Sequence, residues 1–426
     1  MTQPKDGIDK AFLPHPSRLY IETTTRCNLS CPYCPRTLTN SAESDISLGL
    51  IERLSPALKG AESVVLSGLG EPLLHPEIGE IVRLCRGKMP SGASVGFQTN
   101  GSRLDRTVIK RLVDCGLNRL CLSLHELEEP YLSFNIDNIL TRLTEYSDYF
   151  KEIDFGVEII LTRQNLFYIA KVLEKLDSLG VSFVIISQLL PYDAASLAHC
   201  AYDINTQKAV SIYKKWSVRA SRQGIDLRDY YGVLRRFYHD QRDRLLLRIV
   251  EEMKGEASAE GVNLFLSHLL NRDEEWFDRA EEALQKICQK ADNLALLVKA
   301  PGLYPSNIRQ CEFIESGAYF VNVTGDVSPC YYLWHHCNCY LGGLKKEVRP
   351  WVFGNISNGE PLAIWQKGEF MDFRKEVVEY RFPFCFDCSF ALCNLVDGAD
   401  FENDCYISQV PCGACLWCTG LFNCLL

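Results

Sequence analysis

The first half of the chain alternates short apolar runs with longer amphipathic stretches. The short runs are rich in β-branched residues and predict strands at residues 18–22, 63–67, 94–99, 119–123, 153–161 and 182–187. Between them, apolar residues recur at three- and four-residue spacing, which predicts helices at residues 47–58, 77–85, 105–115, 136–146 and 166–179. Six such units predict a parallel sheet with right-handed crossovers. We therefore expect an α/β fold, a partial (β/α)6 TIM-like barrel over residues 1–200, with its chemistry at the carboxyl ends of the strands.

The alternation stops at about residue 201. Long, charge-rich amphipathic stretches at 206–223, 226–254 and 274–290 predict three or four helices, with no strand among them up to residue 300. This all-α insertion or bridge carries no metal-ligand pattern. We expect it to be a scaffold, or a docking surface for a macromolecular substrate.

Composition and charge narrow the class of protein. The 426 residues are 47% hydrophobic, which suffices for packed cores in two or three domains. The net charge is −9 and no block of Lys and Arg stands out, so a nucleic acid is not an expected partner. No signal-peptide pattern and no run of about 18 apolar residues is present, so we expect a cytoplasmic protein with no membrane partner.

Twenty cysteines are many for a chain in a reducing compartment, where clustered thiols favour metal binding over disulfides. Twelve of them fall between Cys311 and Cys424, in a region of strands and turns that we assign to a small cysteine-rich domain over residues 301–426. Five others are scattered in apolar surroundings and are expected to be small core residues, namely Cys85, Cys115, Cys121, Cys200 and Cys288.

A CxxxCxxC array follows the first predicted strand directly. It contains Cys27, Cys31 and Cys34, on a loop that Pro32 and Pro35 stiffen. Three thiolates on so short a loop can converge on one soft metal centre. A closed zinc site needs four ligands, whereas an iron–sulfur cube held by three cysteines keeps one iron free. A zinc knuckle that lacks one ligand, or three unrelated thiols, are the alternatives.

This spacing, with Tyr33 just before the last cysteine, resembles the cluster loop of the radical SAM superfamily. The resemblance implies that Cys27, Cys31 and Cys34 bind a 4Fe-4S cluster whose free iron holds S-adenosylmethionine. In that family an electron from the cluster cleaves this cofactor to a 5′-deoxyadenosyl radical, and the residue matching Tyr33 contacts the adenine through its backbone. It also implies a reducing partner such as ferredoxin or flavodoxin.

Three further segments at strand ends resemble the family's cofactor-binding segments. Residues 68–72, GLGEP, match its GxGEP turn, which implies that Gly68, Gly70 and Glu71 contribute to the site of the amino group of S-adenosylmethionine. Asn100, after the third strand, and Ser123, in the fourth, correspond to contacts with the ribose and methionine moieties. A turn-forming asparagine and a helix-capping serine are the alternatives for these last two.

The cysteine-rich domain resembles the SPASM or twitch domain found behind many radical SAM barrels. An upstream Cys311, a predicted hairpin and a Gly325-xxxx-Cys330 motif carry this resemblance. It implies one or two auxiliary 4Fe-4S clusters, and a pair of zinc sites is the alternative. Cys311 and Cys330 are assigned to one cluster, completed by Cys337, Cys339 or the tail. The second is assigned to Cys385, Cys388 and Cys393, closed by Cys405 or Cys412, and Cys415 and Cys418 are further candidate ligands.

The tail, PCGACLWC at residues 411–418, resembles a radical SAM subgroup of metalloenzyme maturases associated with tungsten-cofactor oxidoreductases of the aldehyde ferredoxin oxidoreductase type. This implies an oxidoreductase or maturase that acts on a protein or peptide, plausibly a partner metalloenzyme. A maturase of a small ribosomal peptide is a second possibility. A non-catalytic iron–sulfur carrier or scaffold is a third.

Overall fold

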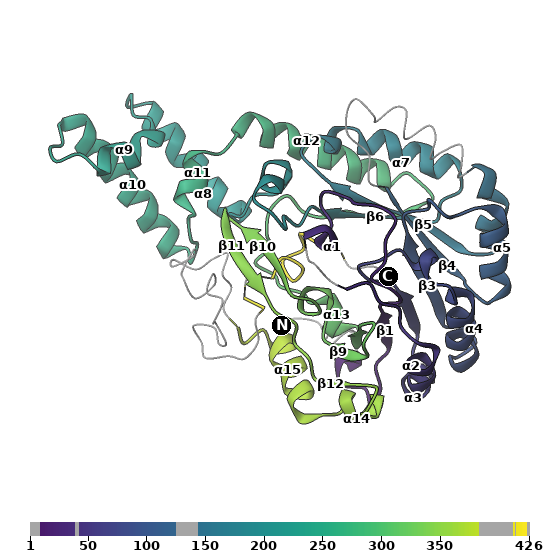
Figure 1. The fold of residues 1–426 in the computed structure, drawn as a ribbon. Coiled ribbons are helices and arrows are strands. Elements are labelled where there is room, and N and C mark those ends of the chain that lie inside the picture. Colours follow the sequence, from purple (N-terminus) through teal and green to yellow (C-terminus); the bar gives the residue numbers. More distant parts are fainter. Residues whose placement is uncertain (1–8, 39–41, 125–143, 383–411, 414, 424–426) are drawn as a thin grey trace.

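The computed structural model describes residues 9–38, 42–124, 144–382, 412, 413 and 415–423 (Figure 1). The six predicted strands are present and pair in parallel, each with the next along the chain. The fold class is therefore confirmed. The strands are β1 (Arg18–Ile21), β2 (Ser63–Leu66), β3 (Ser94–Thr99), β4 (Arg119–Leu124), β5 (Asp154–Leu161) and β6 (Phe183–Gln188).

Helices cover the outer side of this curved sheet (Figure 1). They are α2 (Leu48–Arg53), α3 (Ser55–Leu58), α4 (Ile78–Lys88), α5 (Arg106–Asp114) and α7 (Ile169–Ser178), and the predicted helix at 136–146 lies largely outside the described residues. The side chain of Asp105 accepts a hydrogen bond from the backbone N–H of Val108, which fixes the start of α5. Short helical turns occur at η1 (Asp9–Phe12), α1 (Pro35–Leu38), η2 (Pro72–Leu74), η3 (Ser147–Lys151), η4 (Asn165–Phe167) and η5 (Ala195–His199).

A helical extension projects from the barrel at the left of Figure 1. It consists of α8 (Gln207–Ser221), η6 (Leu227–Asp229), α9 (Tyr230–Leu234), α10 (Gln241–Ala259) and α11 (Leu266–Leu270). Trp216, Ile249 and Met253 belong to a hydrophobic cluster of its own, separate from that of the barrel. A separate core explains why this segment breaks the strand–helix alternation without disturbing the sheet.

The end of the predicted insertion belongs to the barrel. Helix α12 (Glu274–Ala291) packs against α7, and β7 (Leu297–Lys299) pairs in parallel with β6. The expectation that residues 201–300 contain no strand is therefore wrong at β7. Strand β7 has three residues at the edge of the sheet, and Leu297 is exposed. So short a segment cannot show the alternation of apolar and polar residues that predicts a strand. Cys288 is also exposed on α12, so its prediction as a core residue is wrong.

The cysteine-rich domain continues the barrel sheet on its other edge. Strand β8 (Ala318–Val321) pairs in parallel with β1, and β9 (Asp326–Ser328) returns antiparallel to β8. The predicted hairpin is confirmed, with Gly325 at its turn in the left-handed region, where φ is +88°. The other elements are α13 (Glu312–Glu315), η7 (Tyr331–Leu333), β10 (Cys337–Leu341), β11 (Leu344–Val348), β12 (Gly354–Asn355), α14 (Pro361–Trp365) and α15 (Gly368–Glu379).

The described part of the tail folds back onto the start of this domain. The backbone N–H groups of Ser306 and Gln310 donate to the carbonyls of Thr419 and Cys418, each at 2.8 Å. The Asn423 side chain donates to the carbonyl of Ile186 on β6 at 2.6 Å. The tail cysteines are thereby brought between the barrel and the cysteine-rich domain.

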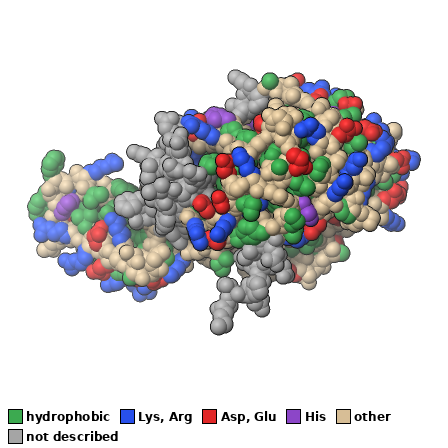
Figure 2. Space-filling view, turned by 90° about the horizontal axis from the view of Figure 1, so that it is seen from below, with side chains coloured by type: hydrophobic (Ala, Val, Ile, Leu, Met, Phe, Trp, Pro, Cys, Tyr) green, Lys and Arg blue, Asp and Glu red, His purple; other side chains and the backbone are tan. Residues whose placement is uncertain are grey.

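Two further observations concern the surface and the helices. On the face shown in Figure 2, basic and acidic side chains are intermixed. Among the helices of the described ranges, none combines the length and the apolar character that crossing a bilayer requires.

Candidate active site

The loop after β1 holds the three cysteines of the CxxxCxxC array at the carboxyl end of the barrel strands. All three residues are half-buried. The backbone N–H of Cys34 donates to the carbonyl of Cys31 at 3.2 Å, and the Thr37 hydroxyl lies 2.7 Å from the Cys34 carbonyl. These bonds close the loop on itself, so its thiols are held on one short segment.

Arg36 places a positive charge inside this loop. Its Nη2 donates to the carbonyls of Cys27 and Leu29 at 3.2 and 3.1 Å. Its Nε is buried and, among the described residues, has no hydrogen-bond partner. Burial raises the pKa of Cys34, while the nearby Arg36 opposes that rise. Arg36 therefore offers a positive charge and a buried N–H donor near the thiols, which would be negatively charged as cluster ligands.

The GLGEP turn after β2 is bonded directly to the cysteine loop. The backbone N–H of Gly70 donates to the carbonyl of Thr24 at 3.0 Å, and that of Glu71 to the carbonyl of Arg26 at 2.7 Å. A Cβ atom on Gly70 would overlap both of these carbonyl oxygens. Glycine is therefore required here because two backbone segments approach closely.

Glu71 ties the ends of β2 and β3 together. Its residue is 2% exposed, and its carboxylate accepts from the Thr99 hydroxyl at 2.6 Å and from the N–H groups of Asn100 and Leu73 at 2.7 and 3.1 Å. Burial raises the pKa of Glu71, and these hydrogen bonds oppose the rise. The geometry gives Glu71 the role of holding the loops in place, and its contact with a cofactor stays a prediction.

The other predicted cofactor contacts are not all brought together. The Asn100 side chain donates to the Asn28 side chain at 3.1 Å and lies 3.9 Å from Cys27 Sγ, so it belongs to the cysteine loop. Ser123 is buried and faces the barrel interior. The ring of Tyr33 lies 5.6 Å from that of His199.

A polar group that the sequence analysis missed lies inside the barrel. The Gln98 side chain on β3 donates to Ser123 Oγ at 3.2 Å and also to the Glu158 carboxylate on β5. Burial raises the pKa of Glu158 from 4.5 to about 7. The sequence does carry a signal, because these are polar residues within otherwise apolar strands that point to the same face.

Stability should respond to the titration of Glu158. Because its pKa is raised on folding, the folded state binds more protons than the unfolded state between pH 4.5 and about 7. The free energy of unfolding should therefore decrease as the pH rises through this window, by at most about 3 kcal/mol. Denaturant unfolding at pH 5 and pH 8 measures this change. The difference in unfolding free energy between these pH values should be smaller in Glu158→Gln. An equal difference in the variant and the wild type would contradict the assignment of this pH dependence to Glu158.

Five cysteines of the C-terminal domain interact electrostatically, the half-buried Cys311 and Cys330 and the buried Cys412, Cys415 and Cys418. Burial and the neighbouring thiolates of Cys330 and Cys415 raise the pKa of Cys311. The pKa of Cys415 is instead lowered, because the Cys418 thiol and the N–H groups of Cys418 and Trp417 donate to it. Cys412 is electrostatically coupled to the same thiols. The tail therefore joins Cys311 and Cys330, whereas Cys385, Cys388, Cys393 and Cys405 lie outside the described residues.

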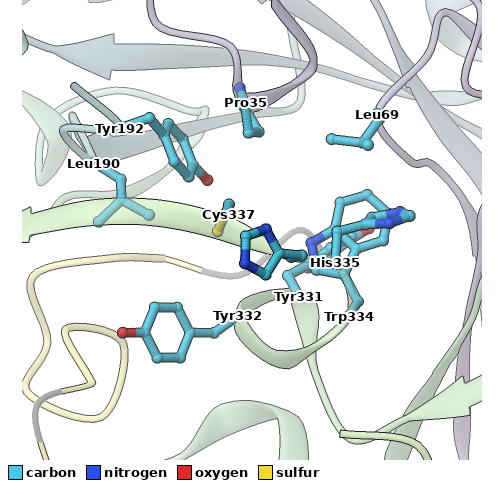
Figure 3. A pocket seen from close by; sticks show the side chains of 10 residues that line it. Pro35, Leu69, Leu190, Tyr192, Tyr331, Tyr332, Trp334, His335 and Cys337 are labelled. Carbon is cyan, nitrogen blue, oxygen red and sulfur yellow. The ribbon is translucent and has the colours of Figure 1, made fainter. Parts of the chain in front are cut away.

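A pocket opens between the barrel loops and the cysteine-rich domain (Figure 3). The empty space between its lining atoms is about 310 Å³, a volume that includes open solvent. Pro35, Leu69 and Tyr192 lie on one side of the view and Tyr331, Trp334 and His335 on the other. Leu190, Tyr332, His336 and Cys337 complete the lining.

Two family models match the chain at the places where these features lie. The model described as the radical SAM superfamily matches residues 21–162. The chain is a member of the radical SAM superfamily. A second model, SPASM, described as an iron–sulfur cluster-binding domain, matches residues 311–389. The predicted family, its enzymatic character and its cofactors are thereby confirmed: a 4Fe-4S cluster, S-adenosylmethionine and auxiliary iron–sulfur binding.

Individual proteins agree with this assignment. The chain is 24% identical over 420 residues to the tungsten-containing aldehyde ferredoxin oxidoreductase cofactor-modifying protein of Pyrococcus furiosus, covering 95% of this chain and 96% of that protein. It is 33% identical over 137 residues to a GTP 3′,8-cyclase of Chlorobaculum tepidum, or 32% of this chain and 39% of that enzyme. A crystal structure of Streptococcus suis SuiB bound to precursor peptide SuiA has a TM-score of 0.51 at 14% identity, covering 94% of this chain and 77% of that one.

The residues of the radical SAM loop fit a cluster by the chemistry of their donors. Cys27, Cys31 and Cys34 offer three soft ligands, and Arg36 offers a compensating charge. Within the described ranges, no three or more Cys, His, Asp or Glu side chains are grouped as a site for a metal ion.

Proposed function

We propose that this radical SAM enzyme cleaves S-adenosylmethionine reductively and modifies a protein or peptide in the maturation of a tungsten-cofactor oxidoreductase. The alignment with the Pyrococcus furiosus cofactor-modifying protein over nearly the whole of both chains carries this proposal. At 95% of this chain, that alignment extends over the helical extension as well as the barrel. A shared barrel alone would not favour one substrate over another.

In this proposal Cys27, Cys31 and Cys34 bind the catalytic cluster. When bound, that cluster supplies the electron for cleavage of S-adenosylmethionine. The protein contributes a fixed loop, because Gly70 and Glu71 bond its backbone and Arg36 bonds its carbonyls. Tyr33, Asn100, Ser123 and the backbone at Gly68 are proposed to contact S-adenosylmethionine, and a ferredoxin or flavodoxin is proposed as the reductant.

For the auxiliary site we propose Cys311 and Cys330 with the tail cysteines Cys412 and Cys415, Cys418 lying beside them. Cys311, Cys330 and Cys412 each interact electrostatically with Cys415, which supports this set. Cys339 also interacts with Cys415, and its thiol is 3.7 Å from the Tyr332 hydroxyl. A second set, formed by Cys385, Cys388, Cys393 and Cys405, is proposed from the sequence alone.

The double variant Cys330→Ala/Cys415→Ala should lose about four irons per chain, the content of one cube. It should still form 5′-deoxyadenosine without added substrate, because the loop after β1 is untouched. Iron analysis after anaerobic reconstitution measures the loss, with the exposed Cys288→Ala as matched control. Iron content equal to that of the control would show that these thiols hold no cluster.

The substrate proposal is tested with an aldehyde ferredoxin oxidoreductase-type protein made in cells that lack this enzyme. Anaerobic incubation with the reconstituted enzyme, S-adenosylmethionine and reductant should change the mass of that protein or of the cofactor released from it, and should raise its activity. Cys27→Ala enzyme is the control. An unchanged oxidoreductase, together with modification of a short ribosomal peptide encoded nearby, would overturn the proposal in favour of the peptide.

A further inference from the structure

A buried carboxylate lies directly beneath the pocket. Glu22 follows β1 and is fully buried, at 0% exposure. Its oxygens accept from the backbone N–H groups of Leu69 at 3.0 Å and Val323 at 3.3 Å. A Cβ atom on Gly68 would overlap the Glu22 side chain, so the GLGEP turn leaves room for it. A carboxylate so enclosed is destabilising unless its hydrogen bonds are satisfied, and this one joins three parts of the chain.

The third partner of Glu22 is His335, from the cysteine-rich domain. His335 Nε2 lies 3.1 and 3.2 Å from the two carboxylate oxygens. Because carboxylate oxygens accept, Nε2 donates, and Nδ1 is the ring nitrogen left for another partner. Within the described part of the chain, Nδ1 has no hydrogen-bond partner.

Packing fixes the orientation of this ring. The Trp334 and His335 rings are 4.0 Å apart between centroids, and Trp334 in turn packs against Phe320 at 4.4 Å. The His335 side chain keeps 21% exposure, on the pocket that it lines (Figure 3). Because the His335 ring is hydrogen-bonded at Nε2 and packed against Trp334, the position of Nδ1 is fixed.

The same pocket reaches the cysteine loop. Pro35, directly after Cys34, lines it, as does Tyr192. A group bound in the pocket would therefore lie beside the loop that we assign to the catalytic cluster.

We propose that this pocket binds the reacting group of the substrate and that His335, oriented by Glu22, holds that group by accepting a hydrogen bond at Nδ1. Four aromatic side chains in the lining favour a flat aromatic or heterocyclic group, and the proposed acceptor selects one with an N–H or O–H donor. His335 is then a substrate-binding residue and Glu22 a positioning residue. The proposal deepens the proposed function, because it assigns the substrate site of the same enzyme.

Indole and 1-methylindole are the first probes, since they differ in one N–H donor. Isothermal titration of the reconstituted enzyme should show indole binding about fivefold more tightly, the size of one hydrogen bond. His335→Lys keeps a donor for Glu22 but has no acceptor atom, and it should bind both probes equally. His239→Lys, in the helical extension, is the matched control. No indole binding by the wild type, no preference for indole, or a preference that persists in His335→Lys would overturn the proposal.

Turnover provides a second measurement, with the oxidoreductase-type protein as substrate. His335→Lys, which has a donor for Glu22 but no acceptor, should lower the yield of modified product per 5′-deoxyadenosine at least tenfold. Both quantities come from the same reaction, so this ratio does not depend on the amount of active enzyme. An unchanged yield would contradict the role of His335. Because the indole titration needs no oxidoreductase, a failed maturase proposal remains distinguishable from a failed pocket proposal.

Discussion

Replacing Cys27, Cys31 and Cys34 together with alanine should abolish formation of 5′-deoxyadenosine while sparing iron in the C-terminal domain. The three thiols lie on one loop after β1, and the thiols proposed for the auxiliary site lie on the cysteine-rich domain and tail. No other described cysteine shares the loop. Product should fall to the level found without enzyme, and iron should fall by about four per chain. Chromatography of the reaction and iron analysis of the same sample measure both.

Cys288→Ala is the control, since this thiol is exposed on α12 and belongs to neither set. It should keep the wild-type iron content and product. Residual 5′-deoxyadenosine from the triple variant would place the catalytic cluster on other cysteines. Loss of all iron would mean instead that the two regions do not fold independently of each other's clusters.

Gly70→Ala should have the second largest effect. The new Cβ would overlap the carbonyl oxygens of Thr24 and Arg26, which are backbone atoms at the start of the cysteine loop. The two segments must separate, which breaks the hydrogen bonds from Gly70 and Glu71 to this loop. Overpacking of this kind costs about 3 kcal/mol. We expect a lower unfolding midpoint and, after reconstitution, loss of most of the iron of the first cluster.

Gly87→Ala is the matched substitution, because a Cβ atom there meets no atom within 4 Å. It lies in α4, where alanine is favoured over glycine by about 1 kcal/mol. That variant should be as stable as wild type or more so, with full iron content. If Gly70→Ala behaved like Gly87→Ala, the close approach of the GLGEP turn to the cysteine loop would be refuted.

The barrel could be predicted from the sequence because its signals are local. Each of the six strands is a short apolar run, and each observed boundary falls within about two residues of the predicted one. Asp105 starts α5 through a contact three residues away. The cysteine loop and the GLGEP turn were likewise recognised from consecutive residues, and the structure adds that the two are bonded together.

The features that were missed depend on contacts between distant segments. Glu22 and His335 are 313 residues apart, and neither belongs to a sequence motif that predicts its contact with the other. Cys311 and Cys330 interact with Cys415 because the tail folds back along residues 302–310. Strand β7 forms by pairing with the edge of β6, and the three residues of β7 alone do not predict a strand. Spacing along the chain carries no information on such pairings.

Reductive cleavage of S-adenosylmethionine is measured most directly as 5′-deoxyadenosine formation by the anaerobically reconstituted chain with this cofactor and a strong reductant. We expect the protein to contain iron and sulfide and to form this product, and to lose that activity when Cys27, Cys31 and Cys34 are replaced. A filled first cluster with no product would contradict it and identify a non-catalytic iron–sulfur carrier or scaffold. Zinc without iron after anaerobic purification would contradict both the radical SAM enzyme and the iron–sulfur carrier.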